Sequence, residues 1–177
     1  EDPDDPIPRH MLAACTGRDV PARASNGFVE QTFDNFAASF ESKLERLGYR
    51  APSLVAGVLA AAGLQAVNGL EILDAGCGTG LCGPLVAPYA RRLIGIDLSE
   101  QMLVHARGKD VYDELQKAEL TEYFAVNRAR FDVIISADTL VYVGDLEDVV
   151  TAAAAEPGRG GIRRRGADVR RHGAAGH

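Results

Sequence analysis

The sequence lacks the features that mark membrane-spanning, secreted and nucleic-acid-binding proteins. No run of 18 apolar residues occurs among its 177 residues, which argues against a transmembrane helix. The chain starts with Glu-Asp-Pro-Asp-Asp, whereas a signal peptide starts with basic residues. Three cysteines, an odd number, do not suit a disulfide framework. The net charge of −6 is opposite in sign to that of most binders of nucleic acids and anionic membranes. We therefore expect a soluble, cytoplasmic protein that binds neither.

Basic charge is concentrated at one end of this acidic chain. Residues 157–177 contain six arginines, six glycines and only two larger apolar residues, Ile162 and Val169. Such a segment buries too little apolar surface to offset the entropy of ordering it, which predicts disorder. Two alternatives are a basic arm for an acidic partner, and a stretch that is not the natural sequence.

The rest of the chain has the length and composition of a single domain, with 46% hydrophobic residues overall. Residues 1–24 contain half of the prolines and read as a linker, with one or two helical turns near residues 10–15. Residues 28–47 carry apolar side chains at steps of three and four, which predicts an amphipathic helix whose phenylalanines belong to the core rather than to a ligand-facing lid. Pro52 opens a second helix that ends near Gly63.

Strands and helices alternate after residue 70. Short apolar segments at 70–75, 92–97 and 131–137 predict strands, and the last is the clearest buried strand in the sequence. Ser99 is a suitable N-cap for a helix that runs to Arg107, while residues 111–126 fit either a strand or a helix. A last helix is expected over residues 145–155. This order predicts an α/β domain over residues 25–156, with a parallel sheet and helices on both faces.

A glycine-rich loop, residues 76–80, follows the first predicted strand. In open α/β sheets, ligands bind beyond the carboxyl ends of the strands, and three acidic residues lie at or near such ends: Asp74, Asp97 and Asp138. Glycines let the backbone approach a ligand closely, and the start of the next helix favours polar groups. We therefore expect the binding site at this edge of the sheet.

Two classes of ligand fit this loop. Residues 78–83 match the dinucleotide pattern G-x-G-x-x-G, with Asp97 nineteen residues beyond the first glycine. Asp74 at the mouth of the loop, with Glu71 behind it, would instead repel a pyrophosphate and attract a cationic amino group. The acidic pair therefore favours a nucleoside that carries an amino acid over a dinucleotide.

Two segments resemble class I S-adenosylmethionine-dependent methyltransferases: Ile-Leu-Asp-Ala-Gly-Cys-Gly-Thr-Gly at 72–80 and Leu-Ile-Gly-Ile-Asp-Leu-Ser at 93–99. The resemblance implies a Rossmann-like fold, S-adenosylmethionine as cofactor and S-adenosylhomocysteine as product. It implies a methionine side formed by Asp74, Gly76, Gly78 and Gly80, a ribose held by Asp97, and an adenine near Leu98, Met102, Glu119 and Leu120. The end of the fourth strand, at Asp138, would face both cofactor and acceptor.

A narrower resemblance concerns residues 33–40 and 47–52, which look like methyltransferases that follow tetratricopeptide repeats in one chain. It implies that residues 1–24 are the remnant of a preceding segment and that Phe36 or Phe40 closes the cofactor site. The family has seven strands, whereas about four are predicted here before the arginine-rich segment. We therefore expect a C-terminally truncated or frameshifted domain whose sheet edge is exposed and promotes self-association.

Methyl transfer needs no protein nucleophile, so no catalytic residue is assigned. Asp138 and Tyr142 are the residues best placed to touch an acceptor, which is a small molecule or a protein; each also has a structural interpretation. No metal site is predicted, because Cys77 and Cys82 lack further ligands, and His105 is expected on a helix surface. The alternatives to a methyltransferase are a degenerate, non-catalytic cofactor-binding domain and an NAD(P)-dependent oxidoreductase.

Overall fold

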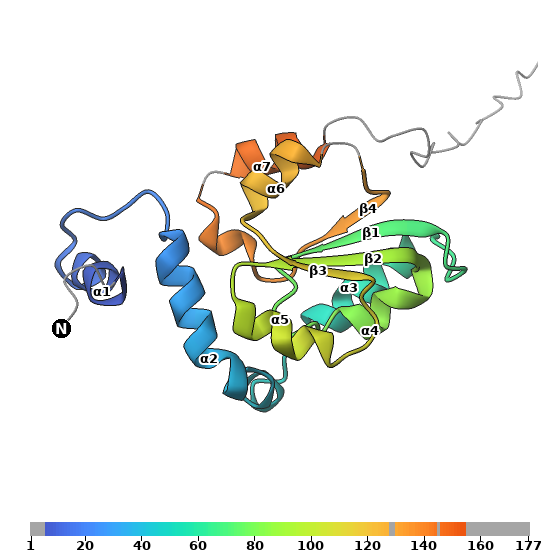
Figure 1. Cartoon of the computed structure of the whole chain (residues 1–177), viewed down its shortest axis with the longest axis horizontal. Coiled ribbons are helices and arrows are strands. Elements are labelled where there is room, and N and C mark those ends of the chain that lie inside the picture. The colour runs from blue at the N-terminus through green and yellow to red at the C-terminus, as the bar shows by residue number, and fades with distance from the viewer. Residues whose placement is uncertain (1–5, 128–129, 145, 155–177) are drawn as a thin grey trace, which may run out of the picture.

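The computed structural model describes residues 6–127, 130–144 and 146–154, and Figure 1 shows their arrangement. The elements in chain order are α1 (Pro6–Thr16), α2 (Asn26–Arg46), α3 (Ala51–Ala61), β1 (Leu70–Ala75), α4 (Gly83–Val86), η1 (Ala87–Tyr89), β2 (Ala90–Asp97), α5 (Glu100–Arg107), β3 (Glu114–Lys117), α6 (Leu120–Val126), β4 (Val133–Ile135), η2 (Leu140–Tyr142) and α7 (Leu146–Ala154). The tail at 157–177 and the expected helix cap Asp145 lie outside the described residues.

The described strands form one parallel sheet in the order β3-β2-β1-β4. β1 is central, and its Asp74 lies opposite Gly95 of β2 and Ile135 of β4. Helices cover both faces of the sheet (Figure 1). The prediction of an α/β, Rossmann-like domain with about four strands and helices on both faces is therefore confirmed.

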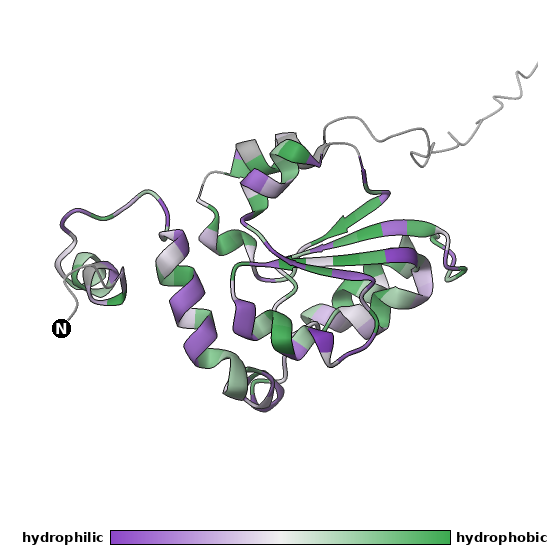
Figure 2. Ribbon diagram, viewed as in Figure 1, coloured by the Kyte–Doolittle hydropathy of each residue, from purple (hydrophilic) through white to green (hydrophobic). Residues whose placement is uncertain are grey.

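Alternating side chains of the two central strands supply the two halves of the core. Ile72 and Leu93 point to the face covered by α3 and α4, where Leu59 and Val86 are buried with them. The residues next in sequence point to the opposite face and pack against α6 and α7; this cluster includes Leu73, Ile94, Phe124 and Val149. Figure 2 shows the apolar character of these strands, which burial on both faces requires.

Local sequence signals set several helix ends as predicted. The Ser99 hydroxyl accepts a hydrogen bond from the Met102 backbone N–H over 3.1 Å, and α5 ends at Arg107 with Gly108 as its C-cap. Ser25, which was not predicted as a cap, caps α2 in the same way through the Phe28 N–H. Residues 111–126, which fitted either a strand or a helix, contain both β3 and α6.

Two expectations about the chain outside the central strands need correction. Residues 131–137 are not the clearest buried strand, because only Val133–Ile135 form β4 and only Ile135 is buried. β4 pairs with β1 alone within the described sheet, so it has a neighbour on one side only. In the predicted linker, α1 is longer than two turns and packs on α2 through the stacked rings of His10 and Phe28, whose centroids are 3.9 Å apart. Among the described residues, no helix combines the length and apolar character that crossing a bilayer requires.

Candidate functional site

A pocket of about 230 Å³ is lined by residues of α2 and by residues at the carboxyl ends of the strands. Nearly all of the residues predicted to bind the cofactor line it: Asp74, Gly76, Gly78, Asp97, Leu98, Met102, Glu119, Leu120 and Asp138. Gly80 does not, because the side on which a Cβ would stand faces Ala106 and the Tyr112 ring. The place of Gly80 on the methionine side therefore stays a prediction.

The glycine loop is shaped by positive backbone angles. Gly76 has φ = 76°, and a Cβ there would lie 2.2 Å from the Thr139 hydroxyl oxygen. At Gly78 the corresponding direction meets only the Phe40 ring, at 4.0 Å. The Thr79 hydroxyl between these turns is buried in the pocket wall and makes no hydrogen bond of ordinary length with the described residues. The loop therefore offers close approach and a buried hydroxyl group to a ligand.

Asp97, at the end of β2, joins the loop to the start of α5. One carboxylate oxygen accepts from the Gly78 N–H and the other from the Ser99 N–H, each over 2.9 Å. Burial raises the pKa of Asp97, and these backbone donors act against that rise. Two of about four lone-pair positions are used, so the carboxylate keeps the capacity to accept from two hydroxyls of a ligand.

Asp74 lies at the floor of the pocket rather than at the mouth of the loop, and its exposed fraction is 1%. β1 is a central strand, so its inner side chains are covered. Burial raises the pKa of Asp74 to about 7; the Tyr112 hydroxyl, which donates to it over 2.7 Å, lowers this pKa, and the charge of Asp97 raises it. Glu71 does not stand behind Asp74, because it is outside the pocket and pairs with Arg91 at 3.1 Å.

Glu119 and Leu120 line the pocket where α6 begins. The Glu119 carboxylate caps this helix by accepting from the Glu122 N–H over 2.9 Å. It also lies 3.5 Å from a guanidinium nitrogen of Arg23. The structure therefore places an acidic residue on the wall as predicted, while its contact with an adenine stays a prediction.

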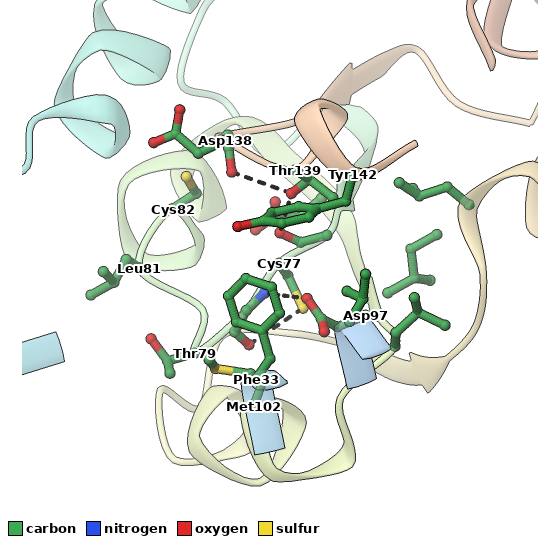
Figure 3. Close-up of a pocket in the computed structure, with 18 of the residues that line it drawn as sticks. Phe33, Cys77, Thr79, Leu81, Cys82, Asp97, Met102, Asp138, Thr139 and Tyr142 are labelled. Carbon is green, nitrogen blue, oxygen red and sulfur yellow. Dashed lines mark hydrogen bonds between the residues drawn. The ribbon is translucent and has the colours of Figure 1, made fainter. Parts of the chain in front are cut away.

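Aromatic rings from α2 form the roof of the pocket. Phe33 and Phe40 line it, and the Phe33 ring meets the Tyr142 ring edge-on at 5.4 Å (Figure 3). Phe36 packs behind Phe40 at 5.6 Å and does not reach the pocket. The expectation of a purely core stripe is therefore wrong for Phe33 and Phe40, and Leu47, at the end of the stripe, is 80% exposed. Apolar residues at steps of three and four indicate that these side chains share one face of the helix, but they do not indicate what covers that face.

Asp138 and Tyr142 stand on the wall that follows β4. Asp138 has φ = 56°, a conformation uncommon for a residue other than glycine. Burial, followed by a hydrogen bond to the Asp138 carboxylate, raises the pKa of the Tyr49 phenol, which comes from the turn after α2. Tyr49 is a wall residue that the sequence analysis missed. The one sequence feature that could have indicated Tyr49 is that an aromatic residue directly follows the glycine that ends the helix.

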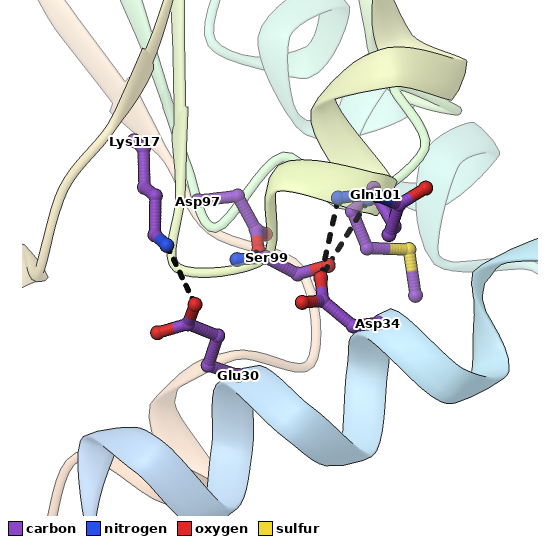
Figure 4. Close-up of polar contacts among 7 residues, drawn as sticks. Glu30, Asp34, Asp97, Ser99, Gln101 and Lys117 are labelled. Carbon is purple, nitrogen blue, oxygen red and sulfur yellow. Dashed lines mark hydrogen bonds and ion pairs between the residues drawn. The ribbon is translucent and has the colours of Figure 1, made fainter.

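Polar contacts attach α2 to the sheet domain (Figure 4). The Asp34 carboxylate accepts from the Ser99 hydroxyl over 2.5 Å and from the Gln101 N–H over 3.2 Å. One turn earlier, the Glu30 carboxylate accepts from the Lys117 ammonium over 2.6 Å. The sequence analysis missed these contacts between α2 and the sheet domain. The one local feature that could have indicated them is the spacing of four residues between Glu30 and Asp34.

The remaining candidate groups are two cysteines and a histidine. Cys77 and Cys82 are buried free thiols, and burial raises the pKa of Cys82 to about 12. No cluster of three metal-ligating side chains occurs in the described part of the chain. His105 is on the exposed side of α5, as predicted.

Comparison with known proteins shows which proteins this chain is similar to. Residues 72–158 match a family described as a methyltransferase domain. A ubiquinone biosynthesis O-methyltransferase of Thiobacillus denitrificans is 39% identical over 92 residues, which cover 49% of this chain and 39% of that protein. The fold resembles a magnesium protoporphyrin IX methyltransferase from Synechocystis crystallised with bound S-adenosylhomocysteine, with a TM-score of 0.58, 21% identity, and coverage of 75% of this chain and 68% of that one.

A second solved structure has a similar fold. An S-adenosylmethionine-dependent methyltransferase from Clostridium acetobutylicum matches with a TM-score of 0.55 and 24% identity over 72% of this chain and 54% of that one. The chain spans only about 40% of the length of the Thiobacillus relative. The matched residues are similar to a methyltransferase domain, and the described part of the chain has the Rossmann-like fold of these solved enzymes.

Proposed function

We propose that this domain binds S-adenosylmethionine in the pocket beneath α2 and transfers its methyl group to an acceptor that enters beside Asp138. The observation that carries the proposal is the charge of the pocket wall. Four carboxylates line it: Asp74, Asp97, Glu119 and Asp138. Among the described lining residues the one basic side chain is Arg23, which is engaged by Glu119 at 3.5 Å.

This charge pattern separates the two ligand classes left open by the glycine pattern. A pyrophosphate brings two negative charges and needs free donors or cations, whereas an ammonium and a sulfonium are attracted to carboxylates. The wall therefore supports a cationic nucleoside over NAD(P). Gly83, the third glycine of the dinucleotide pattern, does not distinguish the two ligand classes, because a Cβ there would lie 2.7 Å from the Tyr112 ring and packing alone therefore requires a glycine.

The lining residues fit the parts of this cofactor. Asp97 has acceptor capacity for the two ribose hydroxyls, and Asp74 for the amino group. Leu98 and Met102 offer an apolar surface to the adenine, while the Thr79 hydroxyl is available to the amino-acid end. The bound cofactor supplies an electrophilic methyl group. The chain binds and orients it and, through the Phe33 and Phe40 roof, excludes water from it.

The acceptor is proposed to approach along the wall that bears Asp138 and Tyr142. The name of the Thiobacillus relative supports an oxygen acceptor for this chain as well. When a hydroxyl oxygen forms the new bond to carbon, its proton must leave, and Asp138 is the carboxylate on this wall that can take it. The Tyr142 phenol is then a hydrogen-bonding partner of the acceptor.

Two narrower expectations are kept as proposals. The first is that the domain belongs with methyltransferases that follow tetratricopeptide repeats and is C-terminally truncated. The second is self-association through β4, which pairs with β1 only within the described sheet. A strand of three residues presents few unpaired backbone groups, so we expect this association to be weak. Sedimentation of the chain over a range of concentrations measures it.

Calorimetric titration of the chain with S-adenosylhomocysteine, with NADH in parallel, tests the cofactor assignment. We expect saturable one-to-one binding of S-adenosylhomocysteine and none of NADH. Binding of NADH alone, or of neither ligand by the folded chain, contradicts the proposal. The alternative of a non-catalytic domain predicts binding without transfer of a labelled methyl group to any phenol, amine or protein acceptor offered.

A further inference from the structure

Tyr112 contacts the floor of the pocket without lining it. It precedes β3, and its hydroxyl donates to Oδ2 of Asp74 over 2.7 Å, across 38 residues of sequence. The ring packs between the two core clusters that contain Cys82 and Cys77. Asp74 lines the pocket and Tyr112 does not, so any effect of the phenol on a ligand passes through the carboxylate.

Three glycines leave the space that the Tyr112 ring fills. A Cβ would lie 3.0 Å from the ring at Gly80, 2.7 Å at Gly83 and 3.0 Å at Gly95. These positions come from the loop, the start of α4 and the middle of β2, so three separate segments leave room for one side chain. The second and third glycines of the G-x-G-x-x-G pattern are thus explained by an internal packing contact.

We propose that Tyr112 is a positioning residue that holds the Asp74 carboxylate, through Oδ2, in the orientation that receives the cationic amino group of the bound ligand. This inference rests on the proposed function. The inference goes beyond the proposed function because it gives a positioning role to Tyr112, which lies outside the pocket, and a packing role to the glycines around its ring. Because the hydrogen bond engages one oxygen, the carboxylate retains a second oxygen for the ligand.

The phenol also sets the protonation of Asp74. Burial and the charge of Asp97 both raise the pKa of Asp74, and the Tyr112 hydroxyl is the group that lowers it. The other titratable groups that interact with this carboxylate are neutral at pH 7, with pKa values raised first by burial: Cys77, Cys82 and Tyr49. Removing the phenolic donor therefore shifts Asp74 toward its neutral form, which attracts an ammonium group less.

The test compares Tyr112→Phe with the wild type, because phenylalanine keeps the ring in the space between the glycines. S-Adenosylhomocysteine affinity is measured by calorimetry from pH 6 to pH 9. We expect a roughly tenfold loss of affinity at pH 7 and a higher pH midpoint of binding. The matched control is Tyr89→Phe, a tyrosine that packs against the same core outside the pocket, and its midpoint should not move.

A second measurement does not need the ligand. The side-chain carboxyl carbon of Asp74 is titrated by NMR in the free wild type and in Tyr112→Phe, and we expect a higher pKa in the variant. Gly83→Ala, which pushes on the ring, should act in the same direction. An unchanged Asp74 titration, or an unchanged binding midpoint with only a lower melting temperature, overturns the inference. If the ligand fails to bind the wild type at any pH, the proposed function fails, while the carboxyl titration still tests the contact.

Discussion

The Ser99 hydroxyl donates to the Asp34 carboxylate over 2.5 Å and thereby joins the roof of the pocket to its wall. Asp34 is in α2, six residues before Phe40 and one residue after Phe33. The Ser99 N–H in turn donates to Asp97, which also holds Gly78. A continuous path of hydrogen bonds thus runs from the roof helix to the glycine loop, and Figure 4 shows its first link, from Ser99 to Asp34.

Replacing Asp34 by alanine should loosen the roof. We expect S-adenosylhomocysteine affinity to fall roughly tenfold, because the bonds to Ser99 and Gln101 are lost. The control is Glu30→Gln on the same helix, which breaks a partly exposed ion pair with Lys117 and should change affinity less than about twofold. Equal effects of the two variants in calorimetry contradict a specific function for the Asp34 contact.

Asp97→Asn should impair both the glycine loop and the ligand contact. An amide presents a donor to one of the two backbone N–H groups that the carboxylate now accepts from. We expect at least about a 100-fold loss of S-adenosylhomocysteine affinity. Faster hydrogen exchange at the Gly78 amide, measured without ligand, should accompany it. If the Gly78 amide of the variant exchanges at the wild-type rate, the loss of binding does not come from a change in the loop, and this explanation is contradicted.

Asp74 should make the stability of the free domain depend on pH. Its pKa is about 7 in the folded chain, raised first by burial, against 3.8 as the ordinary value. A carboxyl whose folded pKa is raised binds more protons in the native state, so its contribution to stability is present below pH 4 and is lost as the pH rises to 7. The free energy of unfolding of the wild type should therefore fall relative to that of Asp74→Asn between pH 4 and pH 7. Urea titrations at several pH values measure this difference, and parallel curves contradict it.

Gly76→Ala should strongly destabilise the domain. The added Cβ would meet the Thr139 hydroxyl at 2.2 Å, and φ = 76° is unfavourable for alanine. We expect a loss of about 2 to 5 kcal/mol in the free energy of unfolding. The matched control is Gly57→Ala inside α3, where no atom lies within 4 Å of the new Cβ. That variant should gain about 0.5 to 1 kcal/mol, and a similar loss in both variants contradicts the steric argument.

The fold class and most of the residues that line the pocket were predictable because their signals are local. The strand at 70–75, the glycine loop and the Ser99 cap each depend on residues within a few positions of one another. A backbone angle that only glycine adopts readily, or a serine hydroxyl three residues before its N–H donor, is encoded in a short segment. For the same reason, Asp97 could be placed at a strand end without knowledge of the sheet order.

Tertiary structure alone decided which distant residues meet. It placed Asp74 at the buried floor rather than at the mouth, moved Glu71 out of the site, and set the 131–137 segment at the edge of the described sheet. Tyr112 reaches Asp74 across 38 residues and Asp34 reaches Ser99 across 65. Such contacts depend on how helices and strands pack, because a hydrogen bond or a buried ring needs a partner that no local pattern specifies. The sequence by itself determined the helices, the strands and the glycine loop. Packing decided which residues cover the pocket, which residue lies at its floor, and that the pKa of Asp74 is raised.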